Sequence, residues 1–137
     1  VSCTQEKVIK KLLFSIFVEE ERYEKFRRQH ISKKMTENDC DQRISQNKIY
    51  KNDNSCKETN TFILDDAQKV KDICKGKKDG MTKSTKTFSI VVCKLKNEGA
   101  RKPKCQYRGK HLTNRVVAIK CEGGLPVHFE RDILNAG

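Results

Sequence analysis

The chain has 137 residues, which is enough for one domain and too few for two separate cores. It carries 30 Lys and Arg against 18 Asp and Glu, a net charge of +12, and no tryptophan. A field of this sign attracts polyanions such as RNA, DNA, acidic glycans or anionic membranes. No apolar run approaches the ~18 residues that a membrane-spanning helix requires, so the sequence predicts no transmembrane helix.

Seven cysteines are scattered along the chain. They are Cys3, Cys40, Cys56, Cys74, Cys93, Cys105 and Cys121. No two of them have the close pairing of a zinc site, so we expect disulfides and an oxidising compartment. Six paired cysteines allow about 15 connectivities, and their spacing alone does not choose among them. We expect a mature, secreted, extracellular protein.

The N-terminal third has helical periodicity. Apolar residues recur at helical spacing at Ile9, Leu12, Leu13, Ile16 and Phe17. They predict an amphipathic helix over about residues 6–18, with lysines on its other faces. Helical spacing continues through Tyr23, Phe26 and His30 and predicts a second helix over about 21–32. The two form either one long helix or two helices that bend near the acidic run at 19–21.

Further along the chain, Asn38 or Asp39 can cap a short helix that ends near Ile44. The segment 59–64 is typical of a strand, and a third helix begins after 65–66. A basic, glycine-containing loop is expected over 75–86.

Strands dominate the rest of the sequence. The segment 87–95 is rich in β-branched residues and is the clearest strand. Shorter strands are expected at 105–108, 116–121 and 127–130, with His111 in a polar loop and without an assigned role. Because helices come first and strands follow, the sequence predicts an α+β fold with an antiparallel sheet.

Three motifs carry the chemistry. They read Phe26-Arg27-Arg28-Gln29-His30, then Cys56-Lys57-Glu58-Thr59-Asn60-Thr61-Phe62, then Pro126-Val127-His128-Phe129 shortly after Cys121. Two imidazoles and a lysine supply a base, an acid and a fixed positive charge, which is what phosphodiester cleavage without a metal requires.

These motifs, in this order, resemble the pancreatic-type ribonuclease (ribonuclease A) superfamily, and the middle one matches its CK-x-x-NTF pattern. The similarity runs from Tyr23 to Glu130 and is greatest to the angiogenin-like, three-disulfide branch and to fish members. It implies a ribonuclease A-like fold with three short helices and a bent antiparallel sheet, preceded here by an extra N-terminal helix. It also implies RNA as substrate, no cofactor and no metal. The implied disulfides are Cys40–Cys93, Cys56–Cys105 and Cys74–Cys121.

The resemblance also implies roles for individual residues. His30 is the expected general base on the ribose 2′-hydroxyl, His128 the general acid, and Lys57 the cation that stabilises charge on the phosphate. The remaining residues are expected to bind substrate: Gln29 at the phosphate, Thr61 and Phe129 at a pyrimidine base, and Lys25 and Arg28 at flanking phosphates. The reaction implied is cleavage of single-stranded RNA on the 3′ side of pyrimidines through a 2′,3′-cyclic phosphate.

Several positions depart from the family pattern. Glu130 stands where the family has the aspartate that orients the acid histidine, and Val92 replaces an acidic residue that tunes uridine binding. The loop after Cys74 is shortened, which predicts weak discrimination of the downstream base and modest activity. The tail 131–134 resembles that of angiogenin in layout, where the tail obstructs the pyrimidine pocket.

Residues 1–20 have no counterpart in the family, so we divide the chain into an extension, 1–20, and a ribonuclease domain, 21–137. The extension can dock on the domain, insert into an anionic membrane surface or act as a pro-segment. Cys3 remains as a free thiol or as the link of a disulfide-bonded dimer. The alternative function is a cationic angiogenic or bactericidal host-defence protein that binds cell-surface glycans or bacterial membranes, with catalysis secondary.

Overall fold

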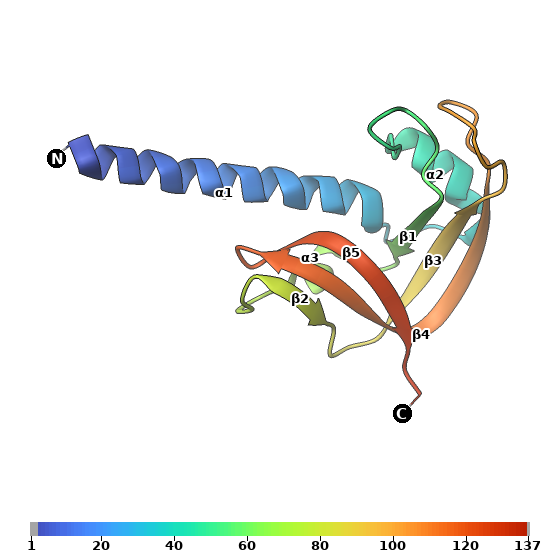
Figure 1. The fold of residues 1–137 in the computed structure, drawn as a ribbon. Helices are drawn as coiled ribbons and strands as arrows, with labels where there is room; N and C mark the ends of the chain where they lie inside the picture. Colours follow the sequence, from blue (N-terminus) through green and yellow to red (C-terminus); the bar gives the residue numbers. More distant parts are fainter. Residues whose placement is uncertain (1–2, 137) are drawn as a thin grey trace.

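A computed structural model describes residues 3–136 and confirms the predicted α+β class, with helices preceding a curled antiparallel sheet (Figure 1). The helical elements are α1 (Cys3–His30), the 3-10 turn η1 (Glu37–Asp39), α2 (Cys40–Gln46) and α3 (Ala67–Lys71). The strands are β1 (Thr59–Ile63), β2 (Gly80–Lys83), β3 (Phe88–Leu95), β4 (Tyr107–Glu122) and β5 (Leu125–Leu134).

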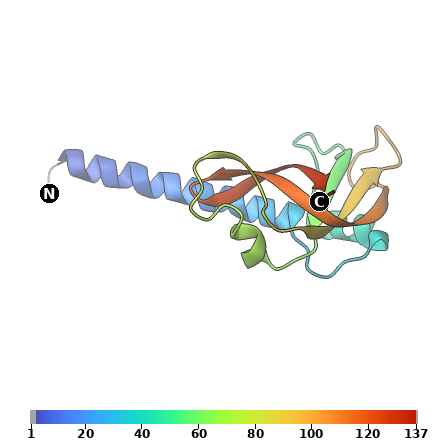
Figure 2. The same ribbon diagram turned by 90° about the horizontal axis from the view of Figure 1, so that it is seen from below.

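The first two predicted helices are one continuous helix, α1. Its C-terminal part buries Tyr23, Phe26 and His30 at helical spacing against the sheet. Its N-terminal part projects beyond the body of the protein in both ribbon views (Figures 1 and 2). Every residue from Cys3 to Phe17 is exposed, so the expectation that the extension docks on its own domain is wrong.

All strands pair antiparallel, in the order β1-β3-β4-β2, with β5 also paired to β4. The long strand β4 changes partners along its length. Its first half pairs with β3, while its second half lies between β2 and β5. This change of partners divides the sheet into two arms that meet along β4, and the arms form the walls of the site described below.

Three local predictions are wrong. The predicted loop around His111 is part of β4, where His111 lies opposite Val91. Strand β2 lies within the predicted basic loop, because β4 offers it a ladder that local sequence does not reveal. The side chain that caps the turn before α2 is that of Thr36, which accepts a hydrogen bond from the backbone N–H of Asn38.

Two clusters of buried apolar side chains lie against the sheet. The first includes Phe26, Ile63, Val70, Phe88, Ile90, Val117 and Ile119. The second, beside α2, includes Met35, Ile44, Ile49, Phe62, Val91 and Tyr107. The three implied disulfides are present: Cys40–Cys93, Cys56–Cys105 and Cys74–Cys121. Each closes a loop of about 50 residues, which restricts the unfolded chain and compensates for a small core.

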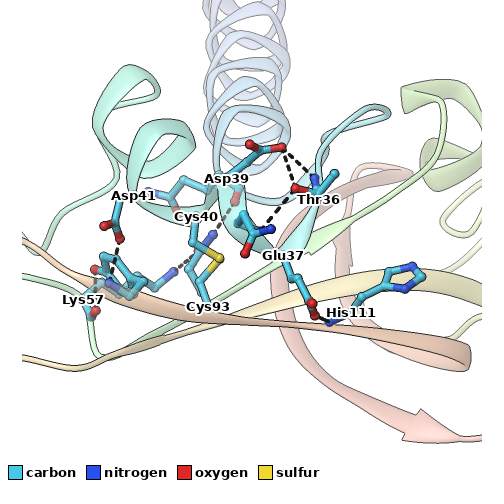
Figure 3. Close-up of a disulfide and its surroundings, with 12 residues drawn as sticks. Thr36, Glu37, Asp39, Cys40, Asp41, Lys57, Cys93 and His111 are labelled. Carbon is cyan, nitrogen blue, oxygen red and sulfur yellow. Dashed lines mark hydrogen bonds between the residues drawn. A yellow bond between two sulfur atoms is a disulfide. The ribbon is translucent and has the colours of Figure 1, made fainter.

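The region around Cys40–Cys93 fixes η1 and α2 to the start of β4 (Figure 3). The Asp41 carboxylate accepts a 2.7 Å hydrogen bond from the backbone N–H of Tyr107. The Glu37 carboxylate accepts one from the backbone N–H of His111. Between these two contacts, a Cβ on Gly109 would overlap the carbonyl oxygen of Glu37, so the close approach requires glycine.

Candidate active site

A cleft of about 1440 Å³ runs between α1 and the two arms of the sheet. All three predicted catalytic side chains line it, although they come from α1, from the segment before β1 and from β5. Nine Lys or Arg residues line the cleft: Arg22, Lys25, Lys57, Lys94, Lys96, Arg108, Lys110, Lys120 and Arg131. Only Glu130 and Asp132 oppose them, so the cleft attracts a polyanion.

His30 lies at the end of α1 and is buried, with 7% of its surface exposed. Its Nδ1 lies 2.9 Å from the carbonyl oxygen of Thr61, which can only accept, so Nδ1 carries the proton and donates it. The lone pair is therefore on Nε2. Burial, followed by the nearby charge of Lys57, lowers the pKa of His30 to about 3, and the hydrogen bond to Thr61 offsets only part of this. The imidazole is thus a neutral base near pH 7.

Lys57 is held in place by two neighbours. Its Nζ donates a 2.8 Å hydrogen bond to Asn60 Oδ1, and the Asn60 amide donates one of the same length to the carbonyl of Gln29. The hydroxyl of Tyr107 donates to the carbonyl of Lys57 at 2.7 Å. Burial and the charge of Lys25 lower the pKa of Lys57. A half-buried cation in a fixed position can stabilise charge that develops on a bound phosphate.

His128 lies on β5 between two interruptions of the β4–β5 ladder. The register shifts once between its pairing and that of Pro126, and again between Phe129 and Arg131. Such bulges change the direction of side chains and are common beside active sites. His128 is more than half exposed, and its Nε2 lies 3.3 Å from Glu130 Oε2. The carboxylate therefore occupies Nε2 and leaves Nδ1 for a substrate.

The predicted base-binding residues lie beside His30. The ring of Phe129 stacks at 5.4 Å and 25° on the imidazole of His30, and both rings line the cleft. Thr61 and Val92 are opposite each other in the β1–β3 ladder, so they share a face of the sheet. An apolar wall, a hydroxyl and a short aliphatic side chain thus meet at one end of the cleft.

The C-terminal tail does not lie across these residues. Strand β5 continues to Leu134, with Ile133 opposite Val116 and Leu134 opposite Arg115. Arg115 also forms an ion pair with Asp132. Neither Ile133 nor Leu134 lines the cleft, so the pocket at Thr61 is open.

The remaining predicted substrate contacts are divided between the cleft and the surface. Lys25 and Gln29 line the cleft. Arg28 does not, because its guanidinium donates to the carbonyls of Asn47 and Lys48 at the end of α2. The structure therefore assigns Arg28 a contact that holds α1 against α2.

Sequence reasoning missed several residues of the site. Asn60 lies within the quoted motif, three residues after Lys57, yet its role depends on a contact with Gln29 that only the fold provides. Tyr107 gave no local signal. The basic residues on β3 and β4 looked like solvated strand charges, although pairing places Lys94 opposite Arg108 on one wall of the cleft.

No group of three His, Cys, Asp or Glu side chains within residues 3–136 is arranged to hold a metal ion. No helix in the same range is long and apolar enough to cross a membrane.

Comparison with known proteins agrees with this geometry. The family model described as pancreatic ribonuclease matches residues 21–130. The chain is 36% identical over 121 residues to ribonuclease-like 3 of Danio rerio, covering 82% of this chain and 80% of that protein. It is 34% identical over 127 residues to angiogenin of Sus scrofa, covering 88% and 83%. The crystal structure of zebrafish RNase5 superposes with a TM-score of 0.74 at 39% identity, covering 82% and 94%. On the matched motifs, the shared fold and the three disulfides, the chain belongs to the pancreatic ribonuclease family.

Proposed function

We propose that this protein is an endoribonuclease that cleaves single-stranded RNA on the 3′ side of pyrimidines by transphosphorylation. The observation that carries the proposal is the meeting of His30, Lys57 and His128 in one cationic cleft, with His30 held as a neutral base. Membership of a family of ribonucleases supports the same class of reaction.

In the proposed reaction, Nε2 of His30 accepts the proton of the ribose 2′-hydroxyl. The 2′-oxygen forms a bond to the adjacent phosphorus while the bond from phosphorus to the 5′-oxygen breaks. His128, in its protonated form, donates a proton from Nδ1 to the leaving 5′-oxygen, and Lys57 stabilises the non-bridging oxygens. The products are a 2′,3′-cyclic phosphate and a free 5′-hydroxyl, and the protons exchanged by the two imidazoles balance. DNA lacks the nucleophile and can bind without being cleaved.

Pyrimidine preference rests on the pocket formed by Thr61, Phe129 and Val92. The Thr61 hydroxyl and backbone N–H can pair with the edge of a pyrimidine, while Phe129 provides an apolar wall. Because Val92 offers no charge, we expect little selection between cytidine and uridine. Gln29 and Lys25 are proposed to contact phosphates. The open pocket supports a competent enzyme, whereas the short loop after Cys74 supports modest turnover.

Digestion of yeast tRNA by the wild type and by His128→Ala tests the proposal. The wild type should degrade tRNA, and the variant should lose most of the activity, since the leaving oxygen then departs without a proton donor. An inert wild type, or a variant as active as the wild type, would contradict it. The three internal disulfides support secretion into an oxidising compartment.

A second candidate is an angiogenic or bactericidal role in which a cationic surface acts on cells. The net charge of +12 and the relatives named angiogenin favour it. Acidic surface glycans or bacterial membranes are the partners it implies. Killing of bacteria that persists in His128→Ala would support this role, and killing lost with that substitution would assign the effect to cleavage.

A further inference from the structure

The first fifteen described residues of α1, Cys3 to Phe17, form a helix that is exposed along its whole length (Figures 1 and 2). Contacts with the domain begin later, where Arg22 forms an ion pair with Glu122 and Tyr23 becomes buried. An isolated helix of this length is marginally stable in water, so we look for a surface that covers it. We call residues 3–18 the extension helix.

The extension helix exposes an apolar surface too large for an isolated soluble protein. Seven of its apolar side chains are between 51% and 70% exposed: Val8, Ile9, Leu12, Leu13, Phe14, Ile16 and Phe17. Together they offer on the order of 700 Å², more than the few hundred Å² typical of a surface patch on a monomer. Two such helices would bury roughly 1,400 Å², which lies within the range of stable protein–protein interfaces.

Charge along α1 is divided between its two ends. Lys7, Lys10 and Lys11 make the N-terminal half basic, and the run 19–21 is three glutamates. A parallel pair of these helices would place lysines beside lysines and glutamates beside glutamates. An antiparallel pair places the basic half of each helix beside the acidic end of the other, which is favourable.

The same pattern favours a protein partner over an anionic membrane. Glu6 precedes Ile9 by three residues and Glu20 follows Ile16 by four, so both carboxylates lie in line with the apolar stripe. An anionic bilayer that received the stripe would meet these carboxylates at both ends. A second copy of the chain would instead meet them with lysines.

We propose that two copies of this protein associate through their extension helices, packed antiparallel with two-fold symmetry. Leu13, near the middle of the apolar stripe, lies at the centre of the interface, and each basic half faces the partner's acidic run. This association is independent of the nuclease chemistry. It places Cys3 of the two copies at opposite ends of the helix pair.

The first test is the mass of the full chain in solution under reducing conditions, measured by light scattering and sedimentation. We expect a dimer. Leu13→Glu should raise the dissociation constant more than about tenfold, since it places a carboxylate at the centre of the apolar contact. Leu134→Glu is the matched control, because Leu134 is similarly exposed, at 56%, and lies outside the extension helix and the cleft. Retained tRNA cleavage would show that both variants are folded.

The second test concerns orientation. The triple variant Lys7→Glu/Lys10→Glu/Lys11→Glu should also lose the dimer, because antiparallel packing would then oppose acidic residues. Parallel packing would exchange one set of like charges for another and leave the dimer nearly unchanged. Oxidation of the wild-type dimer should give little Cys3–Cys3 cross-link, whereas rapid cross-linking would overturn the antiparallel arrangement.

Two further results would overturn the proposal. One is a wild type that stays monomeric at the concentrations used for structural work, together with binding to phosphatidylglycerol vesicles that Leu13→Glu abolishes. That outcome would assign the extension helix to a membrane surface. The other is a dimer that Leu13→Glu leaves intact.

Discussion

Asn60 connects the catalytic lysine to the helix that carries the general base. Its side chain is 1% exposed, accepts from Lys57 Nζ at 2.8 Å and donates to the carbonyl of Gln29 at 2.8 Å. We predict that Asn60→Ala lowers kcat about 10- to 100-fold, equivalent to about 1.4–2.7 kcal/mol, because Lys57 then samples positions away from the phosphate. We also expect a loss of about 1–3 kcal/mol in the free energy of unfolding, since the carbonyl of Gln29 is left unpaired.

Asn47→Ala provides a matched control. Asn47 donates a 3.0 Å hydrogen bond to the carbonyl of Arg28, the residue next to Gln29, but it lies outside the cleft. This substitution should reduce stability and leave kcat within about twofold of the wild type. Both variants are assayed with a dinucleotide substrate at a temperature well below their melting transitions.

A double-mutant cycle with Lys57→Ala separates positioning from general damage. If Asn60 acts through Lys57, then adding Asn60→Ala to Lys57→Ala should cost little further activity. The reasoning is refuted if the two effects multiply, or if Asn60→Ala lowers kcat no more than Asn47→Ala does.

Three other predictions concern pH, salt and the disulfide frame. Because burial lowers the pKa of His30 from 6.5 to about 3, only the unfolded chain binds this proton between those pH values; stability should therefore fall as pH drops below 6.5, and urea titrations should show that His30→Gln reduces the slope, by up to about 1.4 kcal/mol per pH unit. Lys110 lines the cleft, so Lys110→Gln should reduce the salt slope of binding to single-stranded DNA by about 0.7, and an equal effect of Lys78→Gln, outside the cleft, would argue against the proposed track. Replacing Cys74 and Cys121 by alanine opens a loop with a sequence separation of 47, and calorimetry should show a loss of about 4 kcal/mol in the free energy of unfolding; an unchanged melting temperature would contradict this.

The sequence predicted the fold class well because helical periodicity and β-branched runs are local signals. It predicted β2 and the full length of β4 poorly, since both depend on pairing between distant segments, as Gly80 with Cys121 shows. The path of the extension helix was also beyond local sequence. An apolar stripe shows that a face needs a partner, and the fold alone shows that the partner is not the protein's own domain.

The site followed the same division. Motifs were enough to name His30, Lys57 and His128, and the fold placed all three in one cleft. Their supporting contacts could not be read from sequence, because Asn60 reaches Gln29 across 31 residues. Arg28 shows the opposite limit, since a matching motif position is used here to contact α2.

The measurement that tests the central claim most directly is the identity of the first product released from cytidylyl-3′,5′-adenosine, followed by ³¹P NMR. The proposed roles of His30 and His128 predict cytidine 2′,3′-cyclic phosphate and adenosine from the wild type. They also predict loss of that product in both His30→Ala and His128→Ala. A first product with a 5′-phosphate, or cyclic phosphate formed equally fast without either imidazole, would contradict the account.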